Sequence, residues 1–180
     1  MPNRKRFKQH SRRIPQFDYS STGLYFVTIC THNMSRDFGE IVAHNMELSE
    51  IGKIAEKYWE EIPNHFKEVS LLEFVVMPNH VHGIIEIQRP NHHVGSGQCP
   101  DPTMGYSTYQ HVQKNSLPSI IGSYKAAVRY WCLRNNYPSF RWQPNYYEHV
   151  IRREESLENI THYICDNPLK WENDEYFNDW

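Results

Sequence analysis

The chain has 180 residues and lacks any long hydrophobic run. A membrane-spanning helix needs a run of about 18 apolar residues or more, and no segment of this sequence reaches that length. The N-terminus is basic, but no apolar stretch follows it, so it does not resemble a secretory signal. We therefore expect a protein without a membrane anchor that works in the cytoplasm.

Cysteine is also scarce, with only four residues that lie far apart: Cys30, Cys99, Cys132 and Cys165. No two of them have the spacing of a zinc ribbon or a redox motif. They are typical of free thiols in a reducing compartment, which agrees with a cytoplasmic location. The sequence also shows no internal repeat.

Positive charge is concentrated at the start of the chain, whereas acidic residues outnumber basic ones in the rest. The net charge is −2, and six of the 19 Lys and Arg residues lie within the first 13 positions, where no acidic residue occurs. A basic arm on an acidic body favours contact with phosphate groups. The alternative is a solvated tail without a partner. The arm's candidates for DNA contact are Arg4, Lys5, Arg6, Arg12 and Arg13.

Residue patterns predict a mixed set of strands and helices. The expected strands cover residues 24–31, 38–42, 71–77 and 80–87, with a two-piece strand at 141–143 and 146–151. A first helix follows the N-cap Ser49, and Pro63 is expected to end it. Two more helices are expected at 117–133 and at about 154–166, the latter stopping before Pro168.

The order of these elements favours one fold class. Helices between the first and second long strands, and between the third and fourth, indicate split βαβ units. We expect an α+β, ferredoxin-like sandwich with an antiparallel sheet and an extra C-terminal helix. The expected divisions are a basic arm at 1–14, one domain at 15–171 with a long exposed loop at 88–116, and an acidic tail at 172–180.

Two histidines begin one of the predicted strands. Side chains alternate along a strand, so His80 and His82 share one face, about 7 Å apart, and can converge on one divalent ion. With 11 histidines in the chain such a pair can arise by chance. However, buried histidines would each need a polar partner, and the pair follows a Pro-Asn turn, where sites are often built.

The last helix carries a tyrosine and an asparagine on one face. Leu157, Ile160 and Ile164 form its apolar stripe, Tyr163 flanks that stripe, and Asn167 lies four residues further on. These two side chains could supply a nucleophile and an oxygen ligand to one metal. Alternatively, Tyr163 packs against the core and Asn167 caps a helix that Pro168 terminates.

Two segments together resemble a known family. Residues 75–83, Val-Val-Met-Pro-Asn-His-Val-His-Gly, resemble the His-hydrophobe-His signature of single-tyrosine transposases. Residues 163–168, Tyr-Ile-Cys-Asp-Asn-Pro, resemble the catalytic helix of the REP-associated tyrosine transposases and related small bacterial proteins. Weaker matches agree in order and spacing, at 23–28, 38–41, 142–143 and 146–152.

The resemblance implies an activity and a set of roles. It implies a transposase-like endonuclease and strand transferase that cuts single-stranded DNA beside a hairpin and forms a 5′-phosphotyrosine. Tyr163 is then the nucleophile, and His80, His82 and Asn167 hold Mg²⁺ or Mn²⁺. Insertion-sequence relatives usually carry glutamine at the position of the third ligand, where this chain has Asn167. The general base is not identified; a metal-bound water and His149 are both candidates. The resemblance is compatible with a monomer and with a homodimer. It is also compatible with a mobile transposase and with a resident protein that uses the same chemistry.

Other basic residues are candidates for phosphate contact. Lys125 and Arg129 share one face of the helix at 117–133, and Arg152 and Arg153 follow the last strand. A solvated charged surface is the alternative reading.

Two other function classes are compatible with the residues. The first is a ferredoxin-like module that binds single-stranded nucleic acid through stacking aromatics such as Tyr25 and Phe26, without cutting it. The second is a hydrolase that acts through metal-bound water, which leaves Tyr163 unexplained.

Overall fold

A single four-stranded sheet organises the fold. The computed structural model describes residues 21–88, 115–174 and 176–177. The strands of the sheet are β1 (Gly23–Cys30), β4 (Val69–Val76), β5 (His80–Ile87) and β6 (Tyr147–Ile151). They lie in the order β4-β5-β1-β6, and every neighbouring pair is antiparallel. With α1 (Glu50–Glu60) between β1 and β4 and α3 (Leu117–Arg134) between β5 and β6, this confirms the expected ferredoxin-like α+β sandwich.

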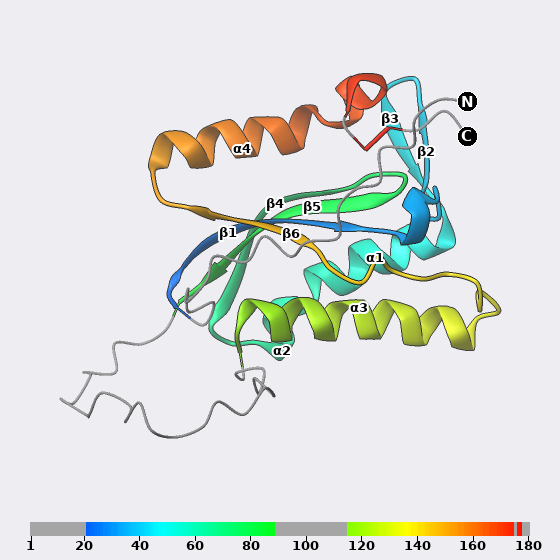
Figure 1. The fold of residues 1–180 in the computed structure, drawn as a ribbon, viewed down its shortest axis with the longest axis horizontal. Coiled ribbons are helices and arrows are strands. Elements are labelled where there is room, and N and C mark those ends of the chain that lie inside the picture. Colours follow the sequence, from blue (N-terminus) through cyan, green and yellow to red (C-terminus); the bar gives the residue numbers. More distant parts are fainter. Residues whose placement is uncertain (1–20, 89–114, 175, 178–180) are drawn as a thin grey trace, which may run out of the picture.

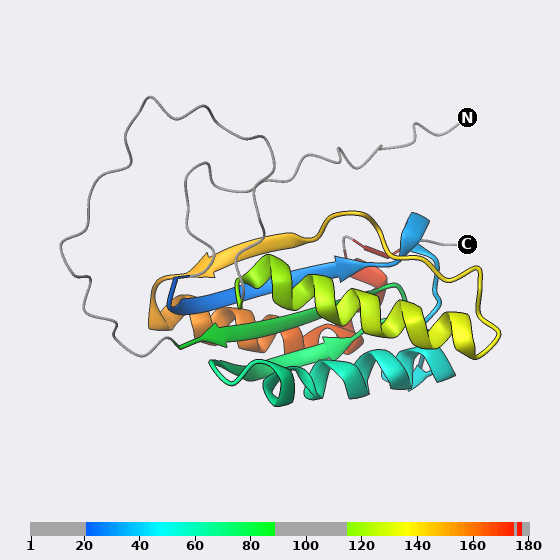
Figure 2. The same ribbon diagram turned by 90° about the horizontal axis from the view of Figure 1, so that it is seen from below.

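Helices cover both faces of the sheet (Figures 1 and 2). The helices α1, α2 (Ile62–His65) and α3 lie on one face, and α4 (Glu154–Asp166) lies on the other. The larger core packs between the sheet and α1 and α3, around Trp59 and Tyr124. A smaller core packs beneath α4, around Phe26, Ile84 and Ile164. The expected extra C-terminal helix is therefore α4, and it carries Tyr163.

Alternation along β5 decides which residues reach each face. Val81 and Ile85 belong to the larger core, whereas Ile84 belongs to the core beneath α4. Because successive side chains of a strand point to opposite faces, His80 and His82 face α4. The two histidines therefore lie on the side of the sheet that also carries Tyr163.

Two local expectations near the first helix differ from the structure. The strand expected at 38–42 is β2 (Gly39–Val42), which pairs with an unpredicted β3 (Asn45–Leu48) in a separate hairpin. Its turn residues Ala43 and His44 have positive φ, which favours Gly or Asn, so the sequence carries no turn signal there. Pro63 does not end the first helix, because α1 already ends at Glu60 and Pro63 lies in the first turn of α2.

The two-piece strand also differs from expectation. Only β6, at 147–151, joins the sheet, and Trp142 contributes a single isolated bridge to Thr31. Pro144 lies between the two pieces and cannot donate a hydrogen bond to a strand ladder.

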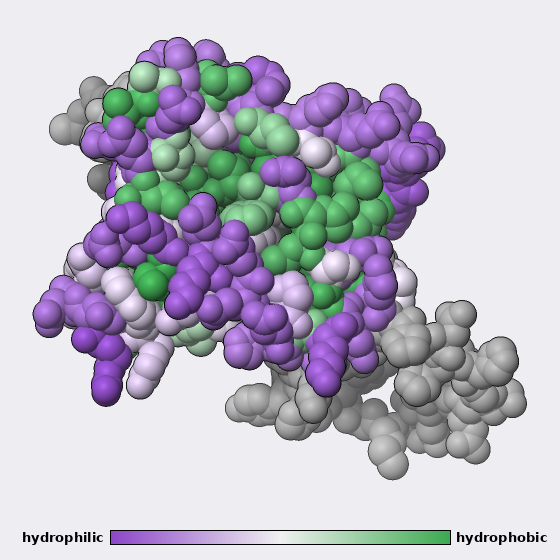
Figure 3. Space-filling view, turned by 180° about the vertical axis from the view of Figure 1, so that it is seen from behind, coloured by the Kyte–Doolittle hydropathy of each residue, from purple (hydrophilic) through white to green (hydrophobic). Residues whose placement is uncertain are grey.

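The rear of the molecule has an apolar band. Figure 3 shows apolar residues gathered between polar surfaces above and below. β4 is the edge strand on this side, and its residues Leu71, Leu72, Phe74 and Val75 are half-buried. A bulge between Leu71 and Phe74 and the exposed Glu73 interrupt the strand. Both features disfavour the addition of a further strand at this edge.

Replacing Gly83 with alanine is expected to destabilise the protein. A Cβ atom at Gly83 would lie 2.2 Å from Cζ2 of the fully buried Trp59, so β5 and α1 must move apart. Overpacking of this kind costs about 1–3 kcal/mol of unfolding free energy. Urea denaturation measures the change.

Gly122 provides the matched control. It lies exposed in α3, and a Cβ there meets nothing within 4 Å. Gly122→Ala is expected to stabilise the helix by about 0.5–1 kcal/mol, because glycine is a poor helix former. Equal stability of Gly83→Ala and the wild type would contradict the close packing of β5 on Trp59.

Candidate active site and metal centre

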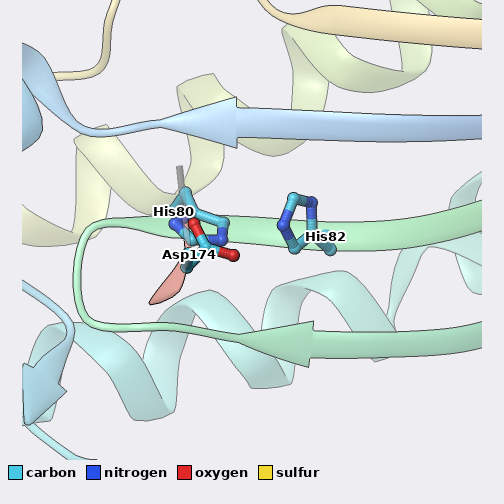
Figure 4. A group of neighbouring side chains, drawn as sticks. All are labelled: His80, His82 and Asp174. Atoms are coloured by element: carbon cyan, nitrogen blue, oxygen red, sulfur yellow. The ribbon is translucent and has the colours of Figure 1, made fainter. Parts of the chain in front are cut away.

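Two buried imidazoles form the centre of the site (Figure 4). His80 is 0% exposed and His82 is 1% exposed, and their ring centroids lie 4.3 Å apart. β5 places them two residues apart, and the turn at Pro78 and Asn79 places His80 at the start of the strand. A buried pair of polar rings requires specific partners, which the surrounding residues supply.

Asn79 determines the tautomer of His80. Nδ1 of His80 lies 2.8 Å from Oδ1 of Asn79, whose amide nitrogen donates to the carbonyl oxygen of Tyr176 at 2.8 Å. Because an amide oxygen only accepts hydrogen bonds, the proton of a neutral His80 lies on Nδ1. The other ring nitrogen, Nε2, is buried and has no hydrogen-bond partner among the described residues. It therefore presents an unused lone pair to the site, as a metal-binding imidazole does.

His82 connects the sheet to α4. Its Nδ1 lies 2.8 Å from the hydroxyl of Thr28, and its Nε2 lies 3.2 Å from the hydroxyl of Tyr163. The ring also stacks on Phe26, with centroids 5.3 Å apart. A proton on Nδ1 can be donated to Thr28, which leaves the lone pair of Nε2 facing the oxygen of Tyr163.

Both imidazoles are neutral at physiological pH. Burial, reinforced by the neighbouring ring of His82, lowers the pKa of His80 well below its ordinary value. Burial also lowers the pKa of His82 to about 3. Since metal ions bind the neutral form of histidine, the environment keeps both ligand atoms available.

These shifts predict a pH-dependent stability. Below the ordinary histidine pKa, the unfolded chain takes up protons that the folded His82 refuses, so unfolding becomes easier as pH falls. Between about pH 7.5 and about pH 5, His82 alone should lower the unfolding free energy by about 2 kcal/mol. Urea denaturation in a chelating buffer measures this slope, and His82→Ala should reduce it. A flat profile across this range would contradict the buried neutral state.

α4 delivers Tyr163 and Asn167 to the same place. Ile164 is fully buried beneath the helix, with Leu157 and Ile160 packed around it, which turns the adjacent Tyr163 toward the histidines. Tyr163 is 40% exposed, and its hydroxyl also donates to Oδ2 of Asp174 at 3.3 Å. Tyr163 therefore combines contact with the buried pair and access to solvent.

Asn167 lies deeper, at 3% exposure. Its amide nitrogen donates to Oδ2 of Asp174 at 3.0 Å. Its Oδ1 is buried and has no hydrogen-bond partner among the described residues. An unpaired buried oxygen is costly, and it is the atom that a metal ligand would offer.

Asp174 is the residue that sequence reasoning missed. Ligand atoms of His80, His82 and Asp174 all lie within 4.8 Å of one another (Figure 4). Asp174 follows η2 (Pro168–Asn173) in the segment expected to be an acidic tail. Its only sequence signal is its nearness to Asn167, seven residues earlier. The same segment brings the ring of Tyr176 within 4.7 Å of His80.

The donor set fits a divalent metal ion. Two imidazole nitrogens and a carboxylate oxygen converge, and unused buried atoms of His80 and Asn167 lie at the same site. Imidazole suits Mn²⁺ and later transition metals better than Mg²⁺, whereas carboxylate and amide oxygens suit both. The donors therefore agree with a divalent metal without selecting one.

The basic residues predicted to contact phosphate lie in several separate parts of the chain. Lys125 is half-buried on the opposite face of the sheet, where its amine donates to the carbonyl oxygen of Gln143 at 2.5 Å, and desolvation lowers its pKa to about 8. Arg129 donates to the carbonyl oxygen of Pro138 at 3.3 Å. Arg152 and Arg153 are exposed between β6 and α4. The arm residues Arg4, Lys5, Arg6, Arg12 and Arg13 lie outside the described residues.

A bilayer-crossing helix is absent from the described ranges, where none is both long and apolar enough.

Comparisons with known proteins support the fold. No protein-family model matches the chain. A solved structure of a REP-associated tyrosine transposase bound to a REP hairpin superposes with a TM-score of 0.58 and 16% identity, over 88% of this chain and 73% of that one. At that identity, the likeness shows a shared fold. An uncharacterized protein of Haemophilus influenzae is 39% identical over 173 residues, which cover 95% of this chain and 94% of that protein. The chain therefore belongs to the same protein family as this Haemophilus influenzae protein.

Proposed function

We propose that the protein is a metal-dependent endonuclease and strand transferase of the transposase type, acting on single-stranded DNA beside a hairpin. Tyr163 is the nucleophile, and His80, His82 and Asn167 hold the metal. One observation carries the proposal: the hydroxyl of a half-exposed tyrosine lies 3.2 Å from a buried imidazole at a site with unused ligand atoms. A tyrosine that only packs against the core would not explain the unpaired buried atoms of His80 and Asn167. It would also not explain why four polar side chains converge there: His80, His82, Asn167 and Asp174.

The fold and the sequence motifs support the same proposal independently. The solved structure that shares this fold is a REP-associated tyrosine transposase bound to a REP hairpin. The His-Val-His strand and the Tyr-Ile-Cys-Asp-Asn-Pro helix are the two segments that resemble that family. In the present fold these segments lie on β5 and α4, and their polar residues face one another.

The metal would be held by His80, His82 and an oxygen ligand. Asn167 is the ligand that the family resemblance implies, and Asp174 is the one whose oxygen lies with the histidine nitrogens. A bound Mg²⁺ or Mn²⁺ supplies charge withdrawal from the scissile phosphate and fixes its orientation. Asn79 and Thr28 hold the two imidazoles in place through their Nδ1 atoms.

The chemical step transfers a phosphate from one oxygen to another. The Tyr163 oxygen attacks the phosphorus, and the bond from phosphorus to the 3′ oxygen breaks, leaving a free 3′-hydroxyl and a 5′-phosphotyrosine. A later attack by a 3′-hydroxyl reverses the chemistry and joins strands without ATP.

The proton of the phenol needs an acceptor before the oxygen becomes a strong nucleophile. The carboxylate of Asp174 accepts a hydrogen bond from the Tyr163 hydroxyl at 3.3 Å, so it is placed to take that proton. His149, an earlier candidate, is exposed on β6. We therefore favour Asp174 as the base whenever Asn167 completes the metal site.

Phosphate contacts would come from the exposed basic residues. Arg152 and Arg153 are exposed between β6 and α4, at the N-terminal end of the helix that carries Tyr163. Lys125 and Arg129 bind carbonyl oxygens of their own chain, so we assign them a smaller role. The N-terminal arm is proposed to add non-specific affinity for DNA.

A covalent-adduct assay tests the proposal. The protein is mixed with labelled single-stranded DNA hairpins that carry random flanks, together with Mn²⁺ or Mg²⁺, and the products are separated on a denaturing gel. A slow-migrating, metal-dependent DNA–protein band is expected. Cleavage without such a band would instead support a hydrolase that uses metal-bound water. Binding with neither band nor cleavage, with both metals, would support a non-catalytic binding module.

A further inference from the structure

Tyr147 lies near the proposed nucleophile although it is remote from it in sequence. It begins β6, at one edge of the sheet, and pairs with Thr28 of β1. Thr28 pairs in turn with His82 and contacts its Nδ1. Directly opposite residues of antiparallel strands face the same side of a sheet. Tyr147 therefore shares the face of the histidines, two strands away from His82.

Phe26 joins Tyr147 to the site through ring contacts. Its ring centroid lies 6.4 Å from that of Tyr147, 6.2 Å from that of Tyr163 and 5.3 Å from that of His82. Phe26 itself is only 8% exposed, whereas Tyr147 and Tyr163 are each 40% exposed. A row of ring contacts thus runs from the buried imidazole of His82 through Phe26 to Tyr147 at the edge of the sheet, and the two tyrosines that contact Phe26 are the rings open to solvent.

A single exposed tyrosine has no functional meaning, because surfaces normally carry some. Tyr130, for example, is 64% exposed on α3, on the other face of the sheet. Tyr147 differs because its ring contacts Phe26, which also contacts the ring of Tyr163. Among the described residues, no strand pairs with the outer edge of β6, so that edge is open. The exposed Arg152 and Arg153 follow the same strand.

We infer that Tyr147, supported by Phe26, is a stacking subsite for an unpaired base next to the scissile phosphate. The inference rests on the proposed function, which places that phosphate at the Tyr163 oxygen. A neighbouring nucleotide must then extend along the surface beside Tyr163, where Phe26 and Tyr147 lie. Aromatic side chains bind any base through its flat face, and only an unpaired base can offer that face. The subsite selects single strands without reading their sequence.

Equilibrium binding tests the inference without any cleavage. All proteins carry Tyr163→Phe, so that no covalent trapping occurs, and the buffer contains a chelator. The probe is a fluorescent oligothymidylate of about 12 nucleotides, which suits a stacking groove of ordinary size. Tyr147→Ala is expected to bind it about 5- to 100-fold more weakly, the range that loss of one stacked base causes. Tyr147→Phe keeps the ring and should bind within about twofold of the parent.

Two controls separate stacking from a structural effect. Tyr130→Ala removes an exposed tyrosine from the other face and should leave affinity unchanged. An abasic oligonucleotide of the same length has phosphates but no bases, so it should bind the parent and Tyr147→Ala equally. Photocrosslinking with 5-iodouracil in the probe, mapped by mass spectrometry, should label Tyr147.

Each result decides the inference. Equal affinity of the parent and Tyr147→Ala for oligothymidylate, or no binding of it by the parent at low salt, overturns the stacking subsite. An equal loss of affinity for the abasic probe also overturns it, because the change would then be structural. If the wild type forms a covalent adduct in these cases, the proposed function still stands. If stacking is found and no adduct forms, the subsite belongs to a binding protein instead.

Discussion

Replacing Tyr163 with phenylalanine is expected to abolish the covalent DNA–protein adduct. The change removes one hydroxyl and keeps the ring that packs edge-on against Phe26, so the fold should be preserved. Strand cleavage and joining should fall by at least about a thousandfold, as is usual when a covalent nucleophile is removed. Time courses on denaturing gels, with Mn²⁺ in excess, measure the loss.

The matched control is Tyr130→Phe, which loses an exposed hydroxyl on α3. It should form the adduct at the wild-type rate. The chain has 12 tyrosines, so an adduct that persists in Tyr163→Phe would assign the nucleophile to another of them. Peptide mapping of the trapped adduct would then identify that residue.

Replacing His80 with alanine is expected to remove both metal binding and the adduct. The unused Nε2 of His80 is buried beside the other ligand atoms, so no solvent-exposed group can readily take its place. Loss of an outer-shell partner typically weakens metal affinity by 10- to 100-fold, so loss of a direct ligand should cost at least about a hundredfold. Calorimetric titration with Mn²⁺ gives the affinity.

His65→Ala is the control, because His65 is exposed on α2, on the other face of the sheet. It should bind Mn²⁺ as the wild type does. Wild-type affinity in His80→Ala would show that the histidine pair does not hold the metal.

The same titration identifies the third ligand. If Asn167 supplies it, Asn167→Ala weakens Mn²⁺ binding, whereas Asp174→Asn retains binding and slows adduct formation through loss of the base. If Asp174 supplies it, Asp174→Asn weakens binding, because a neutral amide replaces a charged oxygen. The two outcomes differ in the affinity for Mn²⁺, so the titration distinguishes them without an activity assay.

Local patterns in the sequence determined most of the fold. The bounds of β5 and α4 follow from alternation, an apolar stripe and a terminating proline, all of which act within a few residues. The element order then left few antiparallel arrangements, because split βαβ units connect in a restricted way. The hairpin of β2 and β3 escaped prediction because Ala43 and His44 adopt positive φ without a residue that favours it.

The sequence by itself also determined that the two histidines share one face of β5, since a strand repeats every two residues. Only the tertiary structure decided what meets that face. Asp174 reaches the histidines from 92 residues beyond His82, and Tyr147 reaches Phe26 across a strand pairing, contacts that no local spacing encodes. Burial by the whole fold likewise lowers the pKa of both histidines and engages Lys125 with carbonyl oxygens. Solvent exclusion depends on all the layers together, so residue type alone could not predict it.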